Sequence, residues 1–468
     1  MRSPIIERDF LLEDELVPET AFVPTPNGFQ YIVHPIGPSI FWSPFFLIAH
    51  ALTTLSLLPY PNDGLSPPYI AIVAAGSTLY GLTGLLIVYK TCRLYTSHSP
   101  AFLTTVTILC ASPLLYYLYR QPMMAHSASF FVCALLLYVL SLLDKAVLPI
   151  RLSGFLLGTI IGLAILVRWL NVFLIPLPAA LFVNLFIHHV QLKDWKSLRM
   201  LVLQGVVASI SAVLVLLPQF AVWQIIYEYW FVFPQGRSGL SLQNMYNIFF
   251  HSNRGLVFWV PLVPLGILTL FQIDPFWLRI SGILSVVFCI FIIGTRDDWY
   301  SGGGYSARYF IETLPILAIG LAQLSNTFWH KLSLRWMITG FSFLLCLYQF
   351  SLMIMVEQVS SGLDLAAYLS GQSLDVAIFK TSISDLLKSP SLLYAIRPNV
   401  LDERQTILAS LVHGIRDFQV YTINLIGLPV VFLGFMLVLA CGSMRWLVPS
   451  LVGISLYCVG WFLLLLSL

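Results

Sequence analysis

The sequence predicts an all-α, polytopic membrane helical bundle, on three observations. Hydrophobic residues make up 58% of the 468 residues and charged residues only 10%, whereas about a quarter of the residues in ordinary soluble domains are charged. The mean hydropathy is +0.87. Apolar runs long enough to cross a bilayer as a helix, about 20 residues, recur along almost the whole chain. The segments between them are too short to form a separate soluble catalytic domain.

The N-terminal segment differs from the rest of the chain. Residues 1–39 are polar and rich in carboxylates, and they lack the basic start and apolar core of a signal peptide. Residues 40–60 are apolar but contain Pro44 and His50. We expect this run to lie along the membrane interface as an amphipathic helix. Residues 1–66 therefore form the first predicted region, an outer acidic segment followed by an interfacial helix.

Twelve spanning helices follow from the remaining apolar runs. Their predicted centres lie near residues 78, 110, 135, 160, 180, 211, 264, 287, 317, 346, 431 and 457. Residues 67–356 then form a transmembrane core, residues 357–419 an outer loop that folds as short helices, and residues 420–468 a C-terminal helical pair. The 7 cysteines lie singly, without Cys-x-x-Cys or Cys/His spacing, so neither a zinc site nor a disulfide framework is predicted.

Charge predicts the orientation of the bundle. We consider the case in which the span near residue 78 runs from outside to inside. Of the basic residues that lie in short loops, most are then on the cytoplasmic side, as the positive-inside rule expects. These residues are Lys90, Arg93, Lys145, Arg151, Lys193, Lys196, Arg199, Arg279, Lys331, Arg335 and Arg445. The short outer loops hold Arg120, Arg168, Arg237, Arg254, Arg296 and Arg308. Both ends of the twelve spans are then outside, so we expect one more spanning helix encoded upstream of Met1.

Residues 296–310, RDDWYSGGGYSARYF, depart most sharply from the apolar background. Ionisable groups are costly in hydrocarbon, so this cluster is expected at a water-filled surface or in a functional cavity. Gly302 to Gly304 predict either a tight turn between two helices or close approach to a substrate. Asp297 and Asp298 form either a solvated turn or a carboxylate site.

Five blocks of sequence follow one another between residue 28 and about residue 325. They read GFQYIVHPIGPSIFWSPFF (28–46), YRQPMMAHSASFF (119–131), GLAILVRWLNVFLIPLPA (162–179), MYNIFFHSNRGLVFWVPLVPL (245–265) and WYSGGGYSARYFIETLPILAIGLA (299–322). In this order they resemble the GT-C superfamily of polytopic glycosyltransferases, especially the bacterial relatives of protein O-mannosyltransferases and aminoarabinose transferases. The resemblance implies a fold with an interfacial helix in the first outer loop and one span more than the twelve counted here.

The resemblance also implies an activity. Members of this superfamily transfer a sugar from a polyprenyl-phosphate donor to an acceptor, with inversion, on the non-cytoplasmic face of the membrane, here the bacterial inner membrane. Their catalytic carboxylate lies early in the first outer loop, a part that is absent here or reduced to IERDFLLEDEL. Either Asp9, Glu13 or Asp14 has taken this catalytic role, or the chain is a catalytically inactive homologue.

The chemistry of such a transfer indicates which residue types to expect. It needs a base close to the acceptor nucleophile and cations that hold the departing phosphate, and guanidinium groups match phosphate oxygens with paired donors. The predicted substrate-binding residues are Tyr31, His34, His126, Arg168, Asn171, Arg254, Asp298, Trp299, Gly303, Arg308 and Tyr309. Arg168 has a second interpretation, as an interfacial anchor that extends to lipid headgroups. His126 and His34 have a second interpretation as histidines with purely structural partners.

The expected partners are a polyprenyl-phosphate sugar, an acceptor that is a lipid, glycan or protein, and membrane lipids. The net charge of +3 is small and scattered and does not indicate nucleic acid. No cofactor is expected, and a metal requirement stays open. Two other classes of protein remain as alternatives. A lipid-linked saccharide polymerase resembles the chain in outline. A secondary transporter would show an internal repeat or midplane charges, which the sequence lacks.

Overall fold

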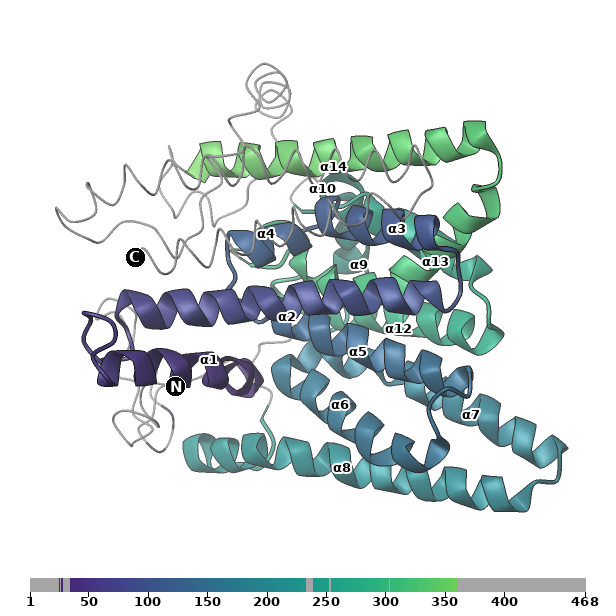
Figure 1. The fold of residues 1–468 in the computed structure, drawn as a ribbon, viewed down its shortest axis with the longest axis horizontal. Coiled ribbons are helices and arrows are strands. Elements are labelled where there is room, and N and C mark those ends of the chain that lie inside the picture. Colours follow the sequence, from purple (N-terminus) through teal and green to yellow (C-terminus); the bar gives the residue numbers. More distant parts are fainter. Residues whose placement is uncertain are drawn as a thin grey trace.

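The computed structural model describes residues 25, 27, 34–232, 239–251, 254–302 and 304–360, which form helices joined by short loops. Within this part, 7 helical segments are long and apolar enough to cross a membrane. They are α2 (Pro67–Arg93), α5 (His126–Asp144), η2 (Ile150–Leu152) with α6 (Ser153–Val167), η3 (Trp169–Leu174) with α7 (Pro176–Gln191), α8 (Trp195–Tyr227), α12 (Phe276–Gly294) and most of α14 (Leu332–Ser360). Figure 1 shows these helices stacked into one bundle. The predicted all-α, multi-pass membrane architecture is confirmed.

Three of the predicted spans are shorter helices. α3 (His98–Cys110) ends before Pro113, and α4 (Leu114–Tyr119) starts directly after it, because proline has no amide hydrogen to continue the helical ladder. The spans predicted near residues 264 and 317 correspond to α11 (Leu262–Thr269) with η4 (Leu270–Gln272), and to α13 (Leu314–Phe328). The spans predicted near residues 431 and 457, and almost all of the 357–419 loop, lie outside the described residues.

Helix α1 (Gly37–Thr54) covers most of the predicted interfacial run, residues 40–60, and is not one of the seven candidate spans. α1 runs antiparallel to the first half of α2, since Phe41 packs on Tyr80 with ring centroids 5.1 Å apart and Phe46 packs on Tyr69 at 5.0 Å. Its first residue, Gly37, lies against the last turn of α6, where a Cβ would be 2.5 Å from the backbone nitrogen of Val167. The interfacial position of α1 stays a prediction.

Small residues allow the closest helix pair to form. α6 packs on α8 through Gly154, Gly158 and Gly162, and a Cβ on Gly158 would lie against the carbonyl oxygen of Ala208 and 2.8 Å from its Cα. In hydrocarbon, where apolar burial gives no driving force between helices, such close backbone approach supplies the packing. This contact fixes the end of α6, which leads directly into Arg168.

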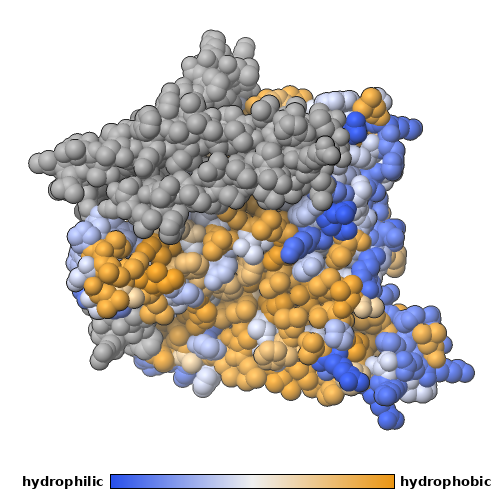
Figure 2. All heavy atoms as spheres, viewed as in Figure 1, coloured by the Kyte–Doolittle hydropathy of each residue, from blue (hydrophilic) through white to orange (hydrophobic). Residues whose placement is uncertain are grey.

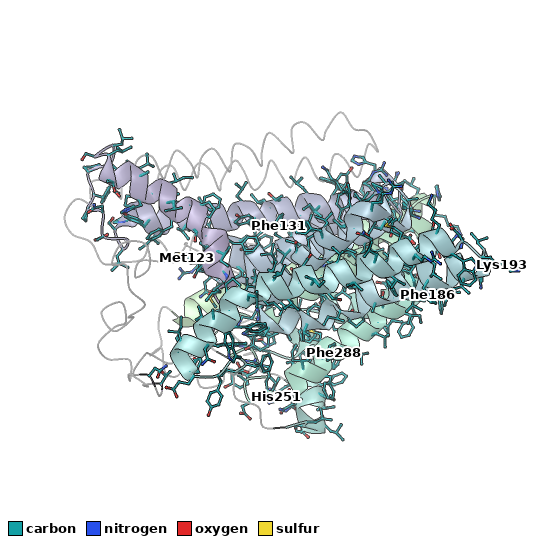
Figure 3. The ribbon with its side chains drawn as sticks, turned by 90° about the horizontal axis from the view of Figure 1, so that it is seen from below. Met123, Phe131, Phe186, Lys193, His251 and Phe288 are labelled. Carbon is teal, nitrogen blue, oxygen red and sulfur yellow. The ribbon has the colours of Figure 1, made fainter. Side chains whose placement is uncertain are left out.

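The basic loops gather at one end of the bundle. Trp277 Nε1 donates a 2.7 Å hydrogen bond to Asp144 Oδ1, which joins the start of α12 to the end of α5. Ser97 Oγ donates to Asn326 Oδ1 at 2.7 Å and joins the α2–α3 loop to α13. Lys193 lies at the tip of the α7–α8 hairpin (Figure 3), and hydrophilic side chains line this end in Figure 2. The described members of the predicted cytoplasmic set therefore lie together, while the membrane side that they face stays a prediction.

The polar stretch lies at the opposite end. α5 begins at His126 and reaches the basic end at Asp144, whereas α6 runs back and ends directly before Arg168. α12 also ends on this side, directly before the 296–310 stretch. A rise of 1.5 Å per residue gives the 19 residues of α5 a length of about 28 Å, close to the thickness of the hydrocarbon core. The two ends are thus about one membrane thickness apart.

Two short helices flank the polar stretch, α9 (Leu242–Phe250) and α10 (Leu256–Trp259). Asn244 Nδ2 donates a 3.2 Å hydrogen bond to the carbonyl oxygen of Arg296 and so ties α9 to the loop after α12. Leu242, Tyr246 and Phe250, spaced four residues apart, are exposed along one face of α9. Such an amphipathic helix is typical of a segment that lies in a membrane interface.

Candidate functional site

A polar centre occupies the end of the bundle opposite the basic loops. It consists of His126, Arg168, Arg296, Asp298, Arg308, Tyr309 and Glu312. His126 is the first residue of α5, and Arg168 is an extended residue between α6 and η3. Arg308, Tyr309 and Glu312 belong to η5 (Arg308–Thr313), the short 3-10 helix before α13. Figure 3 shows the bundle from below, with Met123 and His251 labelled toward this end and Lys193 at the other.

The most deeply buried member is Glu312, whose side chain has no exposed surface. Arg168 Nη1 donates a 2.6 Å hydrogen bond to Glu312 Oε1. His126 Nδ1 lies 3.1 Å from the same oxygen and 2.7 Å from Arg168 Nη1. The ring of Tyr117 packs on the imidazole of His126 with centroids 4.5 Å apart. Arg168 is therefore turned into the bundle, which is not the arrangement of an arginine that extends to lipid headgroups.

A second ion pair lies beside the first. Arg296 donates from Nε and Nη2 to the two carboxylate oxygens of Asp298 at 2.7 and 2.8 Å, and Tyr309 Oη donates to Asp298 Oδ2 at 2.6 Å. Burial alone would raise the pKa of Asp298, but these hydrogen bonds from Arg296 and Tyr309 outweigh it and lower the pKa. Asp298 is thus a carboxylate with fixed partners, not a freely solvated turn residue.

Three guanidinium groups surround the ring of Tyr309. The Cζ atoms of Arg296, Arg168 and Arg308 lie 5.1, 5.5 and 5.8 Å from its centroid, within cation–π distance. Two of these cations have carboxylate partners: Arg168 pairs with Glu312, and Arg296 pairs with Asp298. Arg308 has none among the described residues, and its Nε is buried without a hydrogen-bond partner. The polar centre therefore carries an excess of positive charge and can attract an anion.

The loop before η5 is shaped by left-handed residues. Gly302 has φ +55, while Ser301 and Ser306 have φ 71 and φ 53, values that non-glycine residues rarely adopt. Arg254, itself at φ 68 and only 7% exposed, donates from Nη1 to the carbonyl oxygens of Tyr300 and Gly302. Arg254 therefore holds this loop, and its direct contact with a substrate stays a prediction.

Two other predicted residues flank the centre. Asn171 is buried in η3, and its Nδ2 donates 2.8 Å hydrogen bonds to Ser129 Oγ and to the carbonyl oxygen of Ala164, which hold the chain directly after Arg168. Trp299 packs edge-on against His251 with centroids 5.3 Å apart. Asn171 thus supports the scaffold, and a stacking role of Trp299 on a sugar stays a prediction.

His34 precedes α1 and has an exposed side chain. Although His34 is exposed on one side, desolvation of the imidazole where it faces the protein, together with the positive charges of Arg168, Arg308 and Arg296, lowers its pKa. These charges come from three different segments, so His34 lies at the edge of the polar centre. The neutral form of the His34 imidazole is therefore favoured more than in a free histidine.

Sequence reasoning did not find Glu312 or Tyr117. Glu312 lies within IETLP, at the start of a run interpreted as membrane-embedded, yet an ionisable residue inside an apolar run is itself a signal of a functional site. Tyr117 carries no comparable signal. The predicted catalytic residues Asp9, Glu13 and Asp14, and the predicted contacts Tyr31 and Gly303, lie outside the described residues. Within the part of the chain that the structure describes, no group of His, Cys, Asp or Glu is arranged to hold a metal ion.

No protein-family model and no curated protein sequence matches the chain. Among solved structures, the chain is similar to ArnT from Cupriavidus metallidurans in the apo state. The likeness covers 97% of this chain and 70% of that chain, with 16% sequence identity and a TM-score of 0.43. What the polar centre can bind follows from its own side chains.

Proposed function

We propose that the chain is a membrane glycosyltransferase that moves a sugar from a polyprenyl-phosphate donor to an acceptor on the non-cytoplasmic face of a bacterial inner membrane. The observation that carries the proposal is the convergence of Arg168, Arg296 and Arg308 on Tyr309, with Arg308 left without a carboxylate among the described residues. Such a centre fits a phosphate oxyanion. The five sequence blocks that resemble the GT-C superfamily supply Arg168, Arg308 and Tyr309 and support the same conclusion.

The proposed reaction is a single displacement. The acceptor oxygen or nitrogen attacks the anomeric carbon, the bond from that carbon to the phosphate oxygen breaks, and the polyprenyl phosphate leaves as an anion. Arg308 and Arg168 would hold the phosphate and stabilise the charge that develops on it. The acceptor proton would pass to a carboxylate of the N-terminal segment, for which Asp9, Glu13 and Asp14 are the candidates. Attack opposite the leaving group inverts the anomeric centre.

The distribution of charge supports the proposed orientation. The polar centre lies about one membrane thickness from the end that carries Lys90, Lys145, Lys193 and Lys331. The positive-inside rule assigns such basic loops to the cytoplasm. The polar centre then opens outward, and the lipid tail of the donor would lie along apolar helix faces in the outer leaflet.

Membranes that contain the full chain, incubated with a radiolabelled polyprenyl-phosphate sugar, test this function. Transfer of label to an endogenous acceptor, lost in Arg308→Gln and kept in Lys331→Gln, is the expected result. Lys331 is the matched control because it is an exposed cation at the basic end. Failure of the purified chain to bind the donor at all would overturn the proposal.

The same experiment separates the alternatives. Donor binding that needs Arg308 but gives no transfer would identify a catalytically inactive homologue. Elongation of a lipid-linked saccharide, or its movement across the membrane without a new glycosidic bond, would identify a polymerase or a transporter instead.

A further inference from the structure

Three atoms of the polar centre form a tight triangle. Arg168 Nη1 lies 2.6 Å from Glu312 Oε1 and 2.7 Å from His126 Nδ1, while the third side, from Nδ1 to Oε1, measures 3.1 Å. The hydrogen positions follow from which of these atoms can donate. Nη1 of an arginine carries two hydrogens and no lone pair, whereas a carboxylate oxygen only accepts. Nδ1 of histidine does either, depending on the tautomer.

The short distance between the two nitrogens decides the tautomer. If Nδ1 carried the proton, two donors would face each other at 2.7 Å with no acceptor between them. If Nδ1 is bare, both hydrogens of Arg168 Nη1 are used, one on Glu312 and one on His126. The 3.1 Å distance from His126 Nδ1 to Glu312 Oε1 then separates two acceptors, and both accept from the same guanidinium. Only this arrangement turns both short contacts into hydrogen bonds.

We propose that Arg168 locks His126 in the neutral tautomer with its proton on Nε2, and that Glu312 and His126 are positioning residues that orient Arg168 for an anionic ligand. The orienting role rests on the proposed function, because its ligand is the phosphate of the donor. The tautomer does not depend on it.

Burial decreases from Glu312 toward Arg168. The exposed fractions of the side chains are 0% for Glu312, 4% for His126 and 15% for Arg168. Among the described residues, side-chain hydrogen bonds reach only Nη1 of the Arg168 guanidinium, so Nη2 and Nε are left for a ligand. The backbone of Arg168 is extended, with φ -152 and ψ 125. Its carbonyl oxygen accepts a 3.0 Å hydrogen bond from the backbone N–H of Asn171. Hydrogen bonds at Nη1 and at the backbone carbonyl oxygen therefore hold Arg168 at both its side chain and its main chain.

The tautomer is tested by nitrogen-15 NMR of histidine-labelled full-length chain in nanodiscs at neutral pH. The signals of His126 are those that disappear in His126→Gln. We expect Nδ1 to resonate as a pyridine-type nitrogen without a proton and Nε2 as a pyrrole-type nitrogen with one. A proton on Nδ1, in either the other neutral tautomer or the imidazolium, would overturn the proposal.

The orienting role is tested with polyprenyl phosphate without a sugar as the probe. Glu312→Leu, which removes the acceptor for Arg168 Nη1 at similar side-chain size, should weaken binding about ten- to a hundredfold, which is the usual effect of losing one hydrogen bond to a charged group. In an Arg168→Gln background the same substitution should add little, because Glu312 acts through Arg168. An equal loss in both backgrounds would show that Glu312 acts independently and would contradict the proposal.

Two substitutions of His126 separate its nitrogens. Asn places an amide near the position of Nδ1 and can still accept from Arg168, whereas Gln places its amide near the position of Nε2. We expect His126→Asn to keep more of the probe affinity than His126→Gln, with thermal unfolding used to confirm that both variants are folded. The reverse order would contradict the orienting role. If the wild-type chain binds no polyprenyl phosphate, the proposed function fails, and the NMR result still decides the tautomer.

Discussion

Gly304 lies directly against the guanidinium of Arg308. A Cβ built on Gly304 would be 2.6 Å from Arg308 Cζ and 2.8 Å from Cδ, closer than real Cβ contacts come. Gly302, two residues earlier, turns the chain at φ +55. The glycine run thus makes the tight turn that the sequence allowed and also gives room to the guanidinium of Arg308, while its close approach to a substrate stays a prediction.

The first prediction follows from this contact. Gly304→Ala should displace the guanidinium of Arg308 without unfolding the chain, because the clashing atoms are the far end of a flexible side chain. Binding of polyprenyl phosphate should weaken by about 1.5–3 kcal/mol, roughly ten- to a hundredfold. Affinity measured by tryptophan fluorescence, with thermal unfolding in parallel, checks this. Gly340→Ala is the control, since no atom lies within 4 Å of its added Cβ. An affinity unchanged in Gly304→Ala would show that Arg308 does not contact the phosphate.

The sequence predicted much of this centre but not its internal pairing. His126, Arg168 and Arg308 stood out because ionisable residues are rare beside apolar spans, and the structure brings all three together around Tyr309 and Glu312. The pairing of Glu312 with Arg168 and His126 was not predicted, because these partners lie 144 and 186 residues earlier in the chain. One sequence alone does not reveal such pairs.

The fold shows the same division. Long apolar runs such as those of α5, α8 and α12 were predicted as spans and form helices that are long and apolar enough to cross a membrane. The run around residue 110 was predicted as one helix, but Pro113 divides it into α3 and α4. The start of the run around residue 317 forms the 3-10 helix η5, because it is fixed by tertiary contacts of Arg308, Tyr309 and Glu312 and not by local periodicity.

The second prediction concerns Asp298. Its pKa is lowered in the folded state, since hydrogen bonds from Arg296 and Tyr309 outweigh the opposing effect of burial. A depressed folded pKa stabilises the fold above the unfolded pKa, and this contribution is lost as the pH falls through the folded value. Asp298→Asn should therefore lower the unfolding temperature at neutral pH, and the difference from wild type should shrink on acidification. Because the Asp298 side chain is 38% exposed, the effect should be small.

Thermal unfolding of the detergent-solubilised chain, measured from neutral pH down to acidic pH, checks the second prediction. Asp297→Asn is the matched control, because Asp297 is the adjacent carboxylate and is exposed. A gap between wild type and Asp298→Asn that stays constant with pH would mean that the ion pair does not stabilise the fold through its charge.

The third prediction concerns His34 and ligand binding. Burial and the charges of Arg168, Arg308 and Arg296 lower the pKa of His34 in the free chain. A bound phosphate would bring negative charge to the same place and raise this pKa, so binding should take up a proton. The affinity for polyprenyl phosphate should then rise as the pH falls toward the pKa of His34, and His34→Gln should reduce this dependence. Protonation of the phosphate itself is common to all variants and cancels in the comparison.

Affinities measured across pH for wild type, His34→Gln and His188→Gln check the third prediction. His188 is exposed at the basic end, about one membrane thickness away, and should leave the pH profile unchanged. Identical profiles for His34→Gln and wild type would place the phosphate away from His34.

The fourth prediction separates the ring of Tyr309 from its hydroxyl. The ring faces three guanidinium groups at 5.1, 5.5 and 5.8 Å, whereas the hydroxyl donates to Asp298 at 2.6 Å and accepts from Arg296 Nη2 at 3.3 Å. Tyr309→Phe keeps the cation–π contacts and removes the hydrogen bonds of the hydroxyl with Asp298 and Arg296, so it should raise the pKa of Asp298 and leave phosphate affinity nearly unchanged. Tyr309→Leu removes the ring, and each cation–π contact contributes about 0.5–2 kcal/mol, with the larger values where the pair is desolvated. Its affinity should fall at least about tenfold, since the three cations lose their common support. Equal affinities of the Phe and Leu variants would show that the arginines keep their positions without the ring of Tyr309.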